Sequence, residues 1–381
     1  MSFRTRTVVA MLSVGLLLVM VAVFGVRQAV ASPPAQATGN EGCLACHGQP
    51  GMTTTLPSGE KLYLTVDPQV YNGSIHGQKG QACLDCHPDV DVTAHPKGEA
   101  AWQELGIETR RDLSLLLYRD ACVQCHPDEY DANLDSVHGA ALDSGNKQAA
   151  ICTDCHGTHN ITVPGEPRSR DSQMCELCHA DIFEKYKHSV HGAALLGEGN
   201  PDVPGCVDCH QVHSTQGPSN GGSFHLFSPE ICAKCHADEE LMGHYGLSAD
   251  VFDTYVSDFH GTTVELFQKT APDQETNKPV CIDCHGVHDM KSVNDPESTV
   301  IKANLLVTCQ KCHPDATDNF PTSWVQHYRP SVTKAPLVFF VNLFYLILIP
   351  AVLGVMLLFV VTDAYRRIFK RKKEDLHGKA A

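Results

Sequence analysis

The sequence has no cysteine outside one short repeated pattern, and all 18 cysteines of its 381 residues fall within that pattern. It also has no sustained alternation of apolar and polar residues, which excludes a fold built mainly of half-buried β-strands. Basic residues are scarce between Ser32 and Lys334, where 19 Lys and Arg face 41 Asp and Glu for a net charge of −22. Such an acidic region excludes nucleic acid as a partner. It favours basic patches on a protein partner, or serves mainly to keep the region soluble.

The repeated pattern is Cys-x-x-Cys-His, and it occurs nine times. The nine cysteine pairs with their following histidines are Cys43, Cys46 and His47; Cys83, Cys86 and His87; Cys122, Cys125 and His126; Cys152, Cys155 and His156; Cys175, Cys178 and His179; Cys206, Cys209 and His210; Cys232, Cys235 and His236; Cys281, Cys284 and His285; Cys309, Cys312 and His313. Zinc sites and disulfide frameworks also use paired cysteines, but neither requires a histidine directly after every second cysteine.

The spacing has a chemical reason. Two thiols three positions apart can each add to one of the two vinyl groups of a haem, and the next histidine can then bind the iron from one side. The sequence therefore predicts nine covalently attached haem c groups, with the nine motif histidines as proximal iron ligands.

Eight of the motifs fall into four units, at about residues 70–130, 131–180, 181–245 and 250–320. Each unit opens with a His-Gly pair, which serine precedes by two places in three units and tyrosine by five places in three units. An aspartate-marked motif follows, with aspartate directly before its second cysteine, and a closing motif without aspartate ends the unit. In three units another histidine follows the aspartate-marked motif after three residues. Such recurrence indicates duplication of one structural unit.

Each unit thus holds two motifs and two spare histidines, which predicts a second, distal imidazole for each iron. The predicted distal ligands are the His-Gly histidines His76, His138, His191 and His260, the near-motif histidines His159, His213 and His288, and His95 in the first unit. The motif at Cys43, in a lead segment at about 40–60, precedes the units and has no spare histidine of its own. Its candidate ligands are His188, His225, His244 and His327. Which histidine serves which haem stays open, because ligands can cross between units.

The N-terminal segment 1–31 has the layout of a secretory signal peptide. Arg4 and Arg6 precede an apolar run over 8–26, and Ala29-Val30-Ala31 forms a small-x-small cleavage site. Because the apolar run is long, an uncleaved membrane anchor is the alternative. In both cases the following region 32–335 leaves the cytoplasm.

A second apolar run, over 336–362, is long enough to span a bilayer and predicts a transmembrane helix. The tail 363–381 that follows carries a dense basic cluster, which marks the cytoplasmic side. The cluster consists of Arg366, Arg367, Lys370, Arg371, Lys372 and Lys373. These features predict a haem region tethered to the outer, periplasmic face of a bacterial cytoplasmic membrane.

The predicted fold class is mainly α with extensive irregular loops. Helical apolar spacing runs over 105–118, 180–196 and 249–269, whereas the segments between them are rich in Pro, Gly and polar residues. About 34 residues are available for each motif between 32 and 335. The haems must therefore supply much of the buried apolar surface, and the haem-free chain is not expected to fold stably.

The motifs resemble those of multihaem c-type cytochromes, most closely the periplasmic penta- and decahaem electron carriers with Ser-x-His-Gly and Cys-x-x-Cys-His-Gly-x-His signatures. Ser136 to Gly139 and Cys152 to His159 match these signatures, as do Ser189 to Gly192 and Cys281 to His288. The resemblance covers about 76–313 and implies bis-histidine, low-spin, low-potential haems close enough for electron hopping. The lead motif and the C-terminal anchor depart from that pattern.

Two functions are compatible with these features. The first is a tethered electron carrier between a membrane quinol-linked partner, such as a b-type cytochrome subunit, and a soluble or outer redox protein. The alternative is a multihaem reductase or oxidase of a small nitrogen or sulfur compound, which needs an iron with an open position. The 12 spare histidines outside the tail outnumber the nine motifs, and no motif has lysine in place of its histidine. Both observations favour the carrier and predict no catalytic residue.

Overall fold

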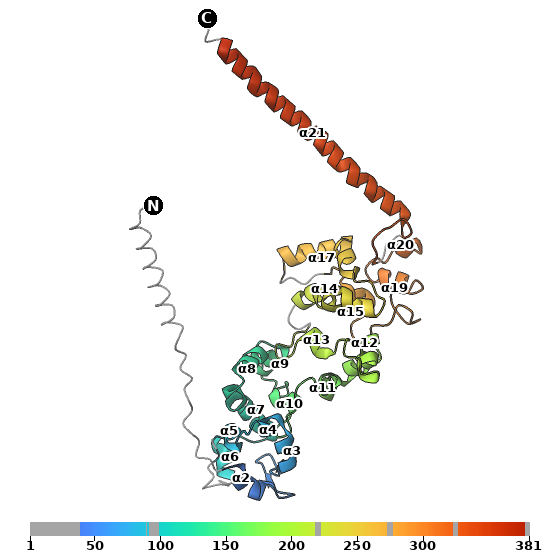
Figure 1. Ribbon diagram of the computed structural model, residues 1–381. Helices are drawn as coiled ribbons and strands as arrows, with labels where there is room; N and C mark the ends of the chain where they lie inside the picture. The colour runs from blue at the N-terminus through green and yellow to red at the C-terminus, as the bar shows by residue number, and fades with distance from the viewer. Residues whose placement is uncertain are drawn as a thin grey trace, which may run out of the picture.

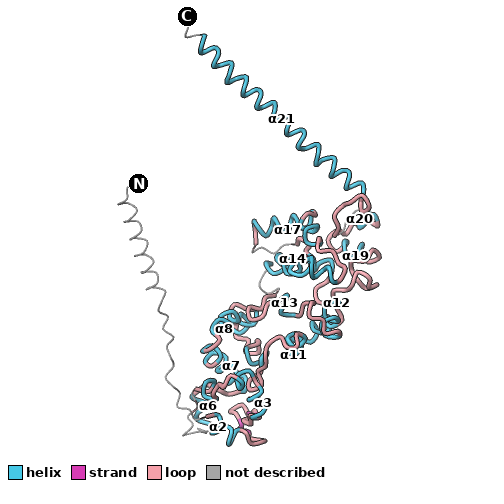
Figure 2. The backbone as a smooth tube through the Cα atoms, viewed as in Figure 1, coloured by secondary structure: helices cyan, strands magenta, loops and turns pink. Residues whose placement is uncertain are grey.

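The computed structural model describes residues 39–88, 90, 99–217, 222–272, 277–322 and 327–377. The predicted signal peptide and the predicted ligand His95 lie outside these residues. The chain forms an elongated array of short helices and long loops, and one long helix, α21, extends from its far end (Figures 1 and 2). The prediction of a mainly helical fold with irregular loops is confirmed.

The helices of the first half are short. Their bounds are α2 Asn40–His47, α3 Pro68–Gly73, α4 Ile75–Gln78, α5 Cys83–Cys86, α6 Glu99–Glu104, α7 Arg110–Asp120, η1 Cys122–Gln124, α8 Pro127–Leu134, α9 Val137–Asp143 and α10 Cys152–His156. One two-stranded antiparallel hairpin, β1 Thr53–Thr55 with β2 Lys61–Tyr63, pairs Thr54 with Leu62. These strands have three residues each, too few to give a sequence alternation.

The second half also consists mostly of short helices joined by loops. Its helices are α11 Ser169–Lys187, α12 Val190–Gly192, η2 Ala193–Gly197, α13 Cys206–His210, α14 Gly222–His236, α15 Glu239–His244, α16 Val251–Val256, α17 Phe259–Thr270, α18 Cys281–His285, α19 Leu305–Gln310, α20 Asn319–Thr322 and α21 Pro336–His377. The helix expected over 180–196 is interrupted, because the buried Ser189 caps a new helix there.

The serine of each Ser-x-His-Gly segment starts the helix that carries the His-Gly histidine. Ser74, Ser136 and Ser189 each accept a hydrogen bond from the glycine N–H three residues later, at 3.0 Å. All three serines are buried. This is the N-cap interaction that satisfies an otherwise unpaired helix N–H, and it fixes the position of the histidine within the first turn.

The glycine after each His-Gly histidine is required by a close backbone approach. A Cβ atom on Gly77, Gly192 or Gly261 would overlap the carbonyl oxygen of the tyrosine six residues earlier. At Gly139 the overlap would be with the corresponding Asn133. The His-Gly pair therefore allows the histidine helix to pack directly against the end of the preceding helix.

The tyrosine five residues before the His-Gly histidine connects this helix to the aspartate-marked motif. The hydroxyls of Tyr71, Tyr186 and Tyr255 donate to the carbonyl oxygen two residues before the first cysteine of that motif, at 2.7, 2.8 and 3.0 Å. Burial raises the pKa of Tyr186 to about 12, so its hydroxyl keeps its proton. The tyrosine thus holds the two histidine-bearing segments of a unit together.

Aspartate in the aspartate-marked motifs is a helix cap. Asp85, Asp154, Asp208 and Asp283 each accept a hydrogen bond from the backbone N–H three residues earlier, at 2.7 to 2.8 Å. Three of them also meet a cationic or basic side chain. Arg111 lies 2.8 Å from Asp154, Arg168 2.5 Å from Asp208, and His225 3.0 Å from Asp283.

Successive units are joined by one recurring backbone hydrogen bond. The N–H groups of Ile75, Val137 and Val190, directly before the His-Gly histidines, donate to the carbonyl oxygens of Ile161, Thr215 and Met290 in the following unit. At the fourth unit the equivalent N–H, that of Phe259, is bonded to the Asp258 side chain instead. The contact therefore recurs between each of the first three units and the unit after it, and it is replaced at α17.

The apolar core between these helices is small. Its main cluster in the described residues consists of Leu226, Tyr255, Val264 and Val280, around which Phe227, Val256, Phe267 and Ile282 are partly buried. Core clusters of this size do not offset the conformational entropy of a chain this long. The motifs must hold additional apolar groups for the fold to be stable.

Helix α21 stands apart from the array. Its apolar side chains, from Leu337 to Ile368, are exposed along its length. Pro336–Ile368 is long and apolar enough to cross a membrane. The predicted transmembrane helix over 336–362 lies within it.

We expect Asp154→Ala to weaken α10 locally, because it removes both the cap and the Arg111 contact. Loss of about 1–2 kcal/mol of local stability would speed amide hydrogen exchange in residues 149–157 by about 5- to 30-fold. Exchange read by mass spectrometry measures this directly. The matched control is Asp131→Ala, at an exposed position of α8, and equal effects of the two changes would contradict the capping role.

We also expect the chain made without haem attachment to lack stable tertiary structure, since its apolar core is small. Circular dichroism and limited proteolysis of the detergent-solubilised protein, with and without the haem-attachment machinery, provide the measurement. Protease resistance of the haem-free chain equal to that of the mature chain would refute this expectation.

Candidate functional site

Most of the nine Cys-x-x-Cys-His motifs lie on or next to short helices, including α2, α5, α10, α13, α18 and α19, and the motifs at Cys175 and Cys232 lie within the longer helices α11 and α14. In these turns the two cysteines lie on the same side, with the histidine directly after them. In the described part of the chain no cysteine is paired in a disulfide, and each first cysteine is half-buried. This is the arrangement that attachment of a haem through two thioether bonds requires.

The chain reverses direction immediately after three of the four aspartate-marked motifs. Gly157 and Gly286 take left-handed backbone angles there, with φ of 75° and 82°, and Gln211 takes the same conformation with φ of 67°. Each of these residues stands two places before the near-motif histidine of its unit. In the first unit Pro88 stands at this position, and its ring excludes the left-handed angle.

The structure brings sixteen histidines together in eight opposed pairs, with ring centres 6.0 to 6.3 Å apart. The pairs are His76 with His126, His87 with His159, His138 with His179, His156 with His213, His191 with His236, His210 with His288, His260 with His313 and His285 with His327. Each pair joins one motif histidine to one spare histidine.

The separation has a direct meaning for metal binding. An ion bonded to two opposed imidazole nitrogens at about 2 Å each holds the two ring centres about 6 Å apart. Rings in van der Waals contact would be closer, and rings without a common partner would show no common distance. The eight pairs therefore fit two axial ligands on one iron.

The pairs follow a simple rule. The His-Gly histidine faces the closing motif of its own unit, as His76 faces His126. The near-motif histidine instead faces the aspartate-marked motif of the preceding unit, as His159 faces His87 and His213 faces His156. The sequence allows histidines to pair within a unit or across a unit border. It does not show which of the two each histidine does.

Burial disfavours the charged form of several of these imidazoles. It lowers the pKa of His191 and of His285 to about 4, and the neighbouring histidines add to the effect. It also lowers the pKa values of His87, His138 and His159. A neutral imidazole has the free nitrogen lone pair that a metal ion needs, so these side chains are ready to bind iron at neutral pH.

Two motif histidines have their ring orientation fixed by the backbone. Nδ1–H of His47 donates to the Leu64 carbonyl oxygen, and Nδ1–H of His210 donates to that of Gln216, both at 2.7 Å. In each ring this leaves Nε2 as the nitrogen available to a metal. The lead motif thus has an oriented proximal histidine, which also lies near His87 and His159.

The four histidines considered for the lead motif have other positions. His327 faces His285, at the opposite end of the array, so its interpretation as a ligand of the Cys43 site is wrong. His188 is exposed and lies 2.9 Å from Glu184, and His225 lies 3.0 Å from Asp283. His244 ends helix α15 on the surface. The sequence signal that would have found His327 is weak, because this histidine stands outside the repeated units.

The nine motifs follow one another in space in the order of the sequence. First cysteines form four close contacts, Cys43 with Cys83, Cys122 with Cys152, Cys175 with Cys206 and Cys232 with Cys281. Between these contacts, second cysteines lie near the next motif, Cys86 by Cys122, Cys155 by Cys178, Cys209 by Cys232 and Cys284 by Cys309. Two kinds of contact therefore alternate along the array.

These contacts group the motifs differently from the sequence units. Each close pair joins the closing motif of one unit, or the lead motif, to the aspartate-marked motif that follows. The lead motif is therefore paired with the Cys83 motif, and the Cys309 motif stands outside the four close pairs. In Figure 1 the lead motif on α2 lies at one end, and α19, with the Cys309 motif, lies near the base of α21.

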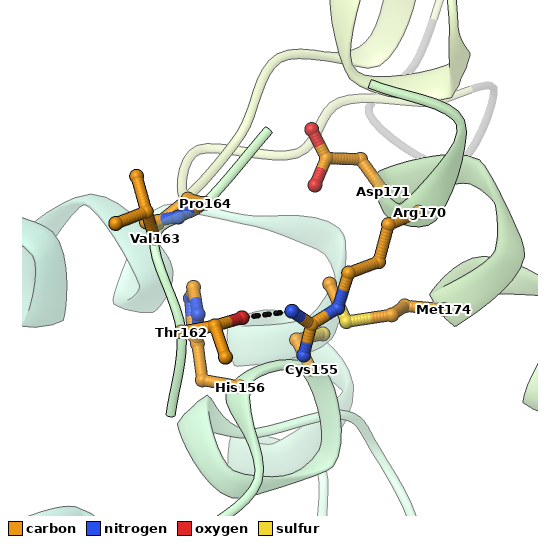
Figure 3. Close-up of a pocket in the computed structure, with 8 residues that line it drawn as sticks. All are labelled: Cys155, His156, Thr162, Val163, Pro164, Arg170, Asp171 and Met174. Atoms are coloured by element: carbon orange, nitrogen blue, oxygen red, sulfur yellow. Dashed lines mark hydrogen bonds between the residues drawn. The ribbon is translucent and has the colours of Figure 1, made fainter. Parts of the chain in front are cut away.

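A small hollow lies beside the fourth motif, and both apolar and charged side chains line it, Asp171 among them (Figure 3). Cys155 and His156 meet the apolar side chains of Val163, Pro164 and Met174 there. Arg170 also enters the hollow and is hydrogen-bonded to Thr162. Apolar walls suit the porphyrin faces, and the guanidinium suits a propionate carboxylate.

Comparisons with known proteins agree with this chemistry. Residues 69–157 match the family model described as cytochrome c7 and related cytochrome c, and residues 144–183 match the doubled CXXCH motif. Cytochrome c-552 of Parabacteroides distasonis is 22% identical over 207 residues, which are 43% of this chain and 40% of that relative. The alignment thus spans less than half of either protein, and no solved structure matches. With its nine attachment motifs and opposed histidines, the chain is a multihaem c-type cytochrome.

Proposed function

We propose that the chain carries nine haem c groups, one on each motif, and conducts electrons along its length as a membrane-tethered carrier. The observation that carries this proposal is the set of eight opposed histidine pairs arranged in chain order. When bound, each haem supplies a one-electron redox couple. The alternating cysteine contacts hold neighbouring attachment points together, which keeps every transfer distance short.

The histidine pairs support a carrier over an enzyme. A reductase or oxidase needs an iron with one open position for its substrate, whereas an iron between two imidazoles has none. Eight of the nine motifs have an opposed histidine in the described residues. Of the two functions compatible with the sequence, the geometry therefore favours electron transfer.

For the lead motif we propose His95 as the second ligand. The near-motif histidines of the second, third and fourth units each face the aspartate-marked motif one unit earlier. By the same offset, the spare histidine that follows the aspartate-marked motif of the first unit serves the motif before it, at Cys43. This proposal rests on sequence register, since His95 lies outside the described residues.

The ends of the array have different partners in this proposal. The Cys309 end lies beside the membrane helix and receives electrons from a quinol-linked membrane partner, such as a b-type cytochrome subunit. The Cys43 end delivers them to a soluble or outer redox protein. The acidic region 32–334 favours partners with basic patches. The basic cluster in the last turns of α21 favours a cytoplasmic C-terminus, with the array in the periplasm.

We expect the purified full-length protein to be entirely low-spin and inert to carbon monoxide. Intact mass gives the number of attached haems, expected to be nine, and electron paramagnetic resonance counts high-spin iron. A stoichiometric high-spin, carbon-monoxide-reactive haem in the wild-type protein would instead support the reductase or oxidase, with the Cys43 site as the first place to look.

We expect His159→Ala to open one iron site, that of the Cys83 motif in the preceding unit, because His159 faces His87. The variant should bind about one carbon monoxide per protein, read by the absorbance of the reduced haems. His188→Ala is the matched control, since His188 is exposed and paired with Glu184. Carbon monoxide binding by the control, or none by His159→Ala, would contradict the ligand assignment.

A further inference from the structure

The linker between the fourth unit and α21 carries a histidine that faces a motif histidine of the array. His327 lies nine residues before Pro336, the first residue of α21. Its ring centre is 6.2 Å from that of His285, with an angle of 24° between the ring planes. The near-motif pair His210 with His288 has almost the same arrangement, 6.0 Å and 22°.

The repeat explains why this position needs a histidine from outside the units. An aspartate-marked motif always faces the near-motif histidine of the following unit, as His210 faces His288. The motif at Cys281 is in the fourth and last unit, so no following unit exists to serve it. His327 takes that place.

The linker that carries His327 is fixed to the array by ionic contacts. The guanidinium of Arg329 lies 3.0 Å from Asp250 and 2.9 Å from Asp253, at the start of α16. Lys334 lies over the ring of Tyr328, with 5.3 Å to the ring centre. Arg329 is two residues after His327, the offset at which Ile161, Thr215 and Met290 join successive units. The linker thus contacts the fourth unit at the same offset from its histidine, but through an ion pair in place of the backbone hydrogen bond.

We propose that His327 is the axial iron ligand of the haem on the Cys281 motif, and that the membrane linker thus acts as a partial fifth unit. Arg329 is a positioning residue in this assignment, since it holds the linker and contacts no motif. The inference rests on the proposed function, in that it requires a haem at Cys281. It implies that the membrane anchor is joined to the array through an iron–histidine bond as well as through the backbone.

The test uses the full-length protein in detergent with the variant His327→Ala and the control His188→Ala. Intact mass should give nine haems for both. We expect His327→Ala to show one high-spin iron in nine and to bind one carbon monoxide, and added imidazole to restore the low-spin state. The control should match the wild type. A low-spin, carbon-monoxide-inert His327→Ala protein with nine haems would overturn the assignment.

If His327→Ala loses a haem or fails to mature, His327→Met decides the question. A methionine ligand gives a distinct absorption band and raises the reduction potential of one haem, which a merely structural residue would not do. A Met variant with unchanged spectrum and potentials would overturn the proposal. Arg329→Ala should keep nine low-spin haems but, unlike the inert wild type, bind carbon monoxide slowly at one of them. No carbon monoxide binding by this variant would remove the positioning role of Arg329.

The outcome for the wild type separates this inference from the proposed function. Fewer attached haems, or a high-spin iron in the unmodified protein, would count against the nine-haem carrier. A wild type with nine low-spin haems and an unaltered His327→Ala variant would leave the carrier standing and reject only the role of His327.

Discussion

Most of the recurring contacts in this protein position one member of an opposed imidazole pair, whose ring centres lie 6.0 to 6.3 Å apart. Serine caps, glycine contacts and tyrosine hydroxyls all act on the segment that carries one member of such a pair. Capped short helices and left-handed turns position the other member. The apolar core is too small to arrange these segments by itself, so iron coordination and haem burial are needed to complete the fold.

Because histidines pair across unit borders, one unit of this protein is not self-contained. In most repeat proteins neighbouring units share an apolar interface, and each unit is chemically complete. Here an aspartate-marked motif has only one of its two histidines within its own unit, and the second comes from the next. His87 and His159, for example, are far apart in sequence but face each other across a unit border. Folding and haem ligation must therefore be coupled along the whole array.

The motifs, their histidines and the recurring His-Gly helices could be predicted from sequence, because covalent attachment and axial ligation demand fixed residue types at fixed spacings. The pairing could not be predicted, since it depends on the turn direction set by Gly157, Gln211 and Gly286. The tyrosine spacing follows from a tertiary contact, the bond from its hydroxyl to the loop before the aspartate-marked motif, which a sequence pattern does not show. His327 was only one of four candidates for the lead motif, because nothing local distinguishes it from a surface histidine, and its position facing His285 could not be predicted.

The one-unit offset also has a consequence for how such arrays lengthen. Each unit provides two motif histidines and two partners, and it exchanges one partner with each neighbour. A duplicated unit inserted at any internal border would therefore receive a partner histidine from the unit after it. It would in turn provide a partner histidine to the unit before it. Every histidine keeps a counterpart, and neither the lead segment nor the membrane linker has to change. Arrays of different length can thus arise by internal duplication between two constant ends.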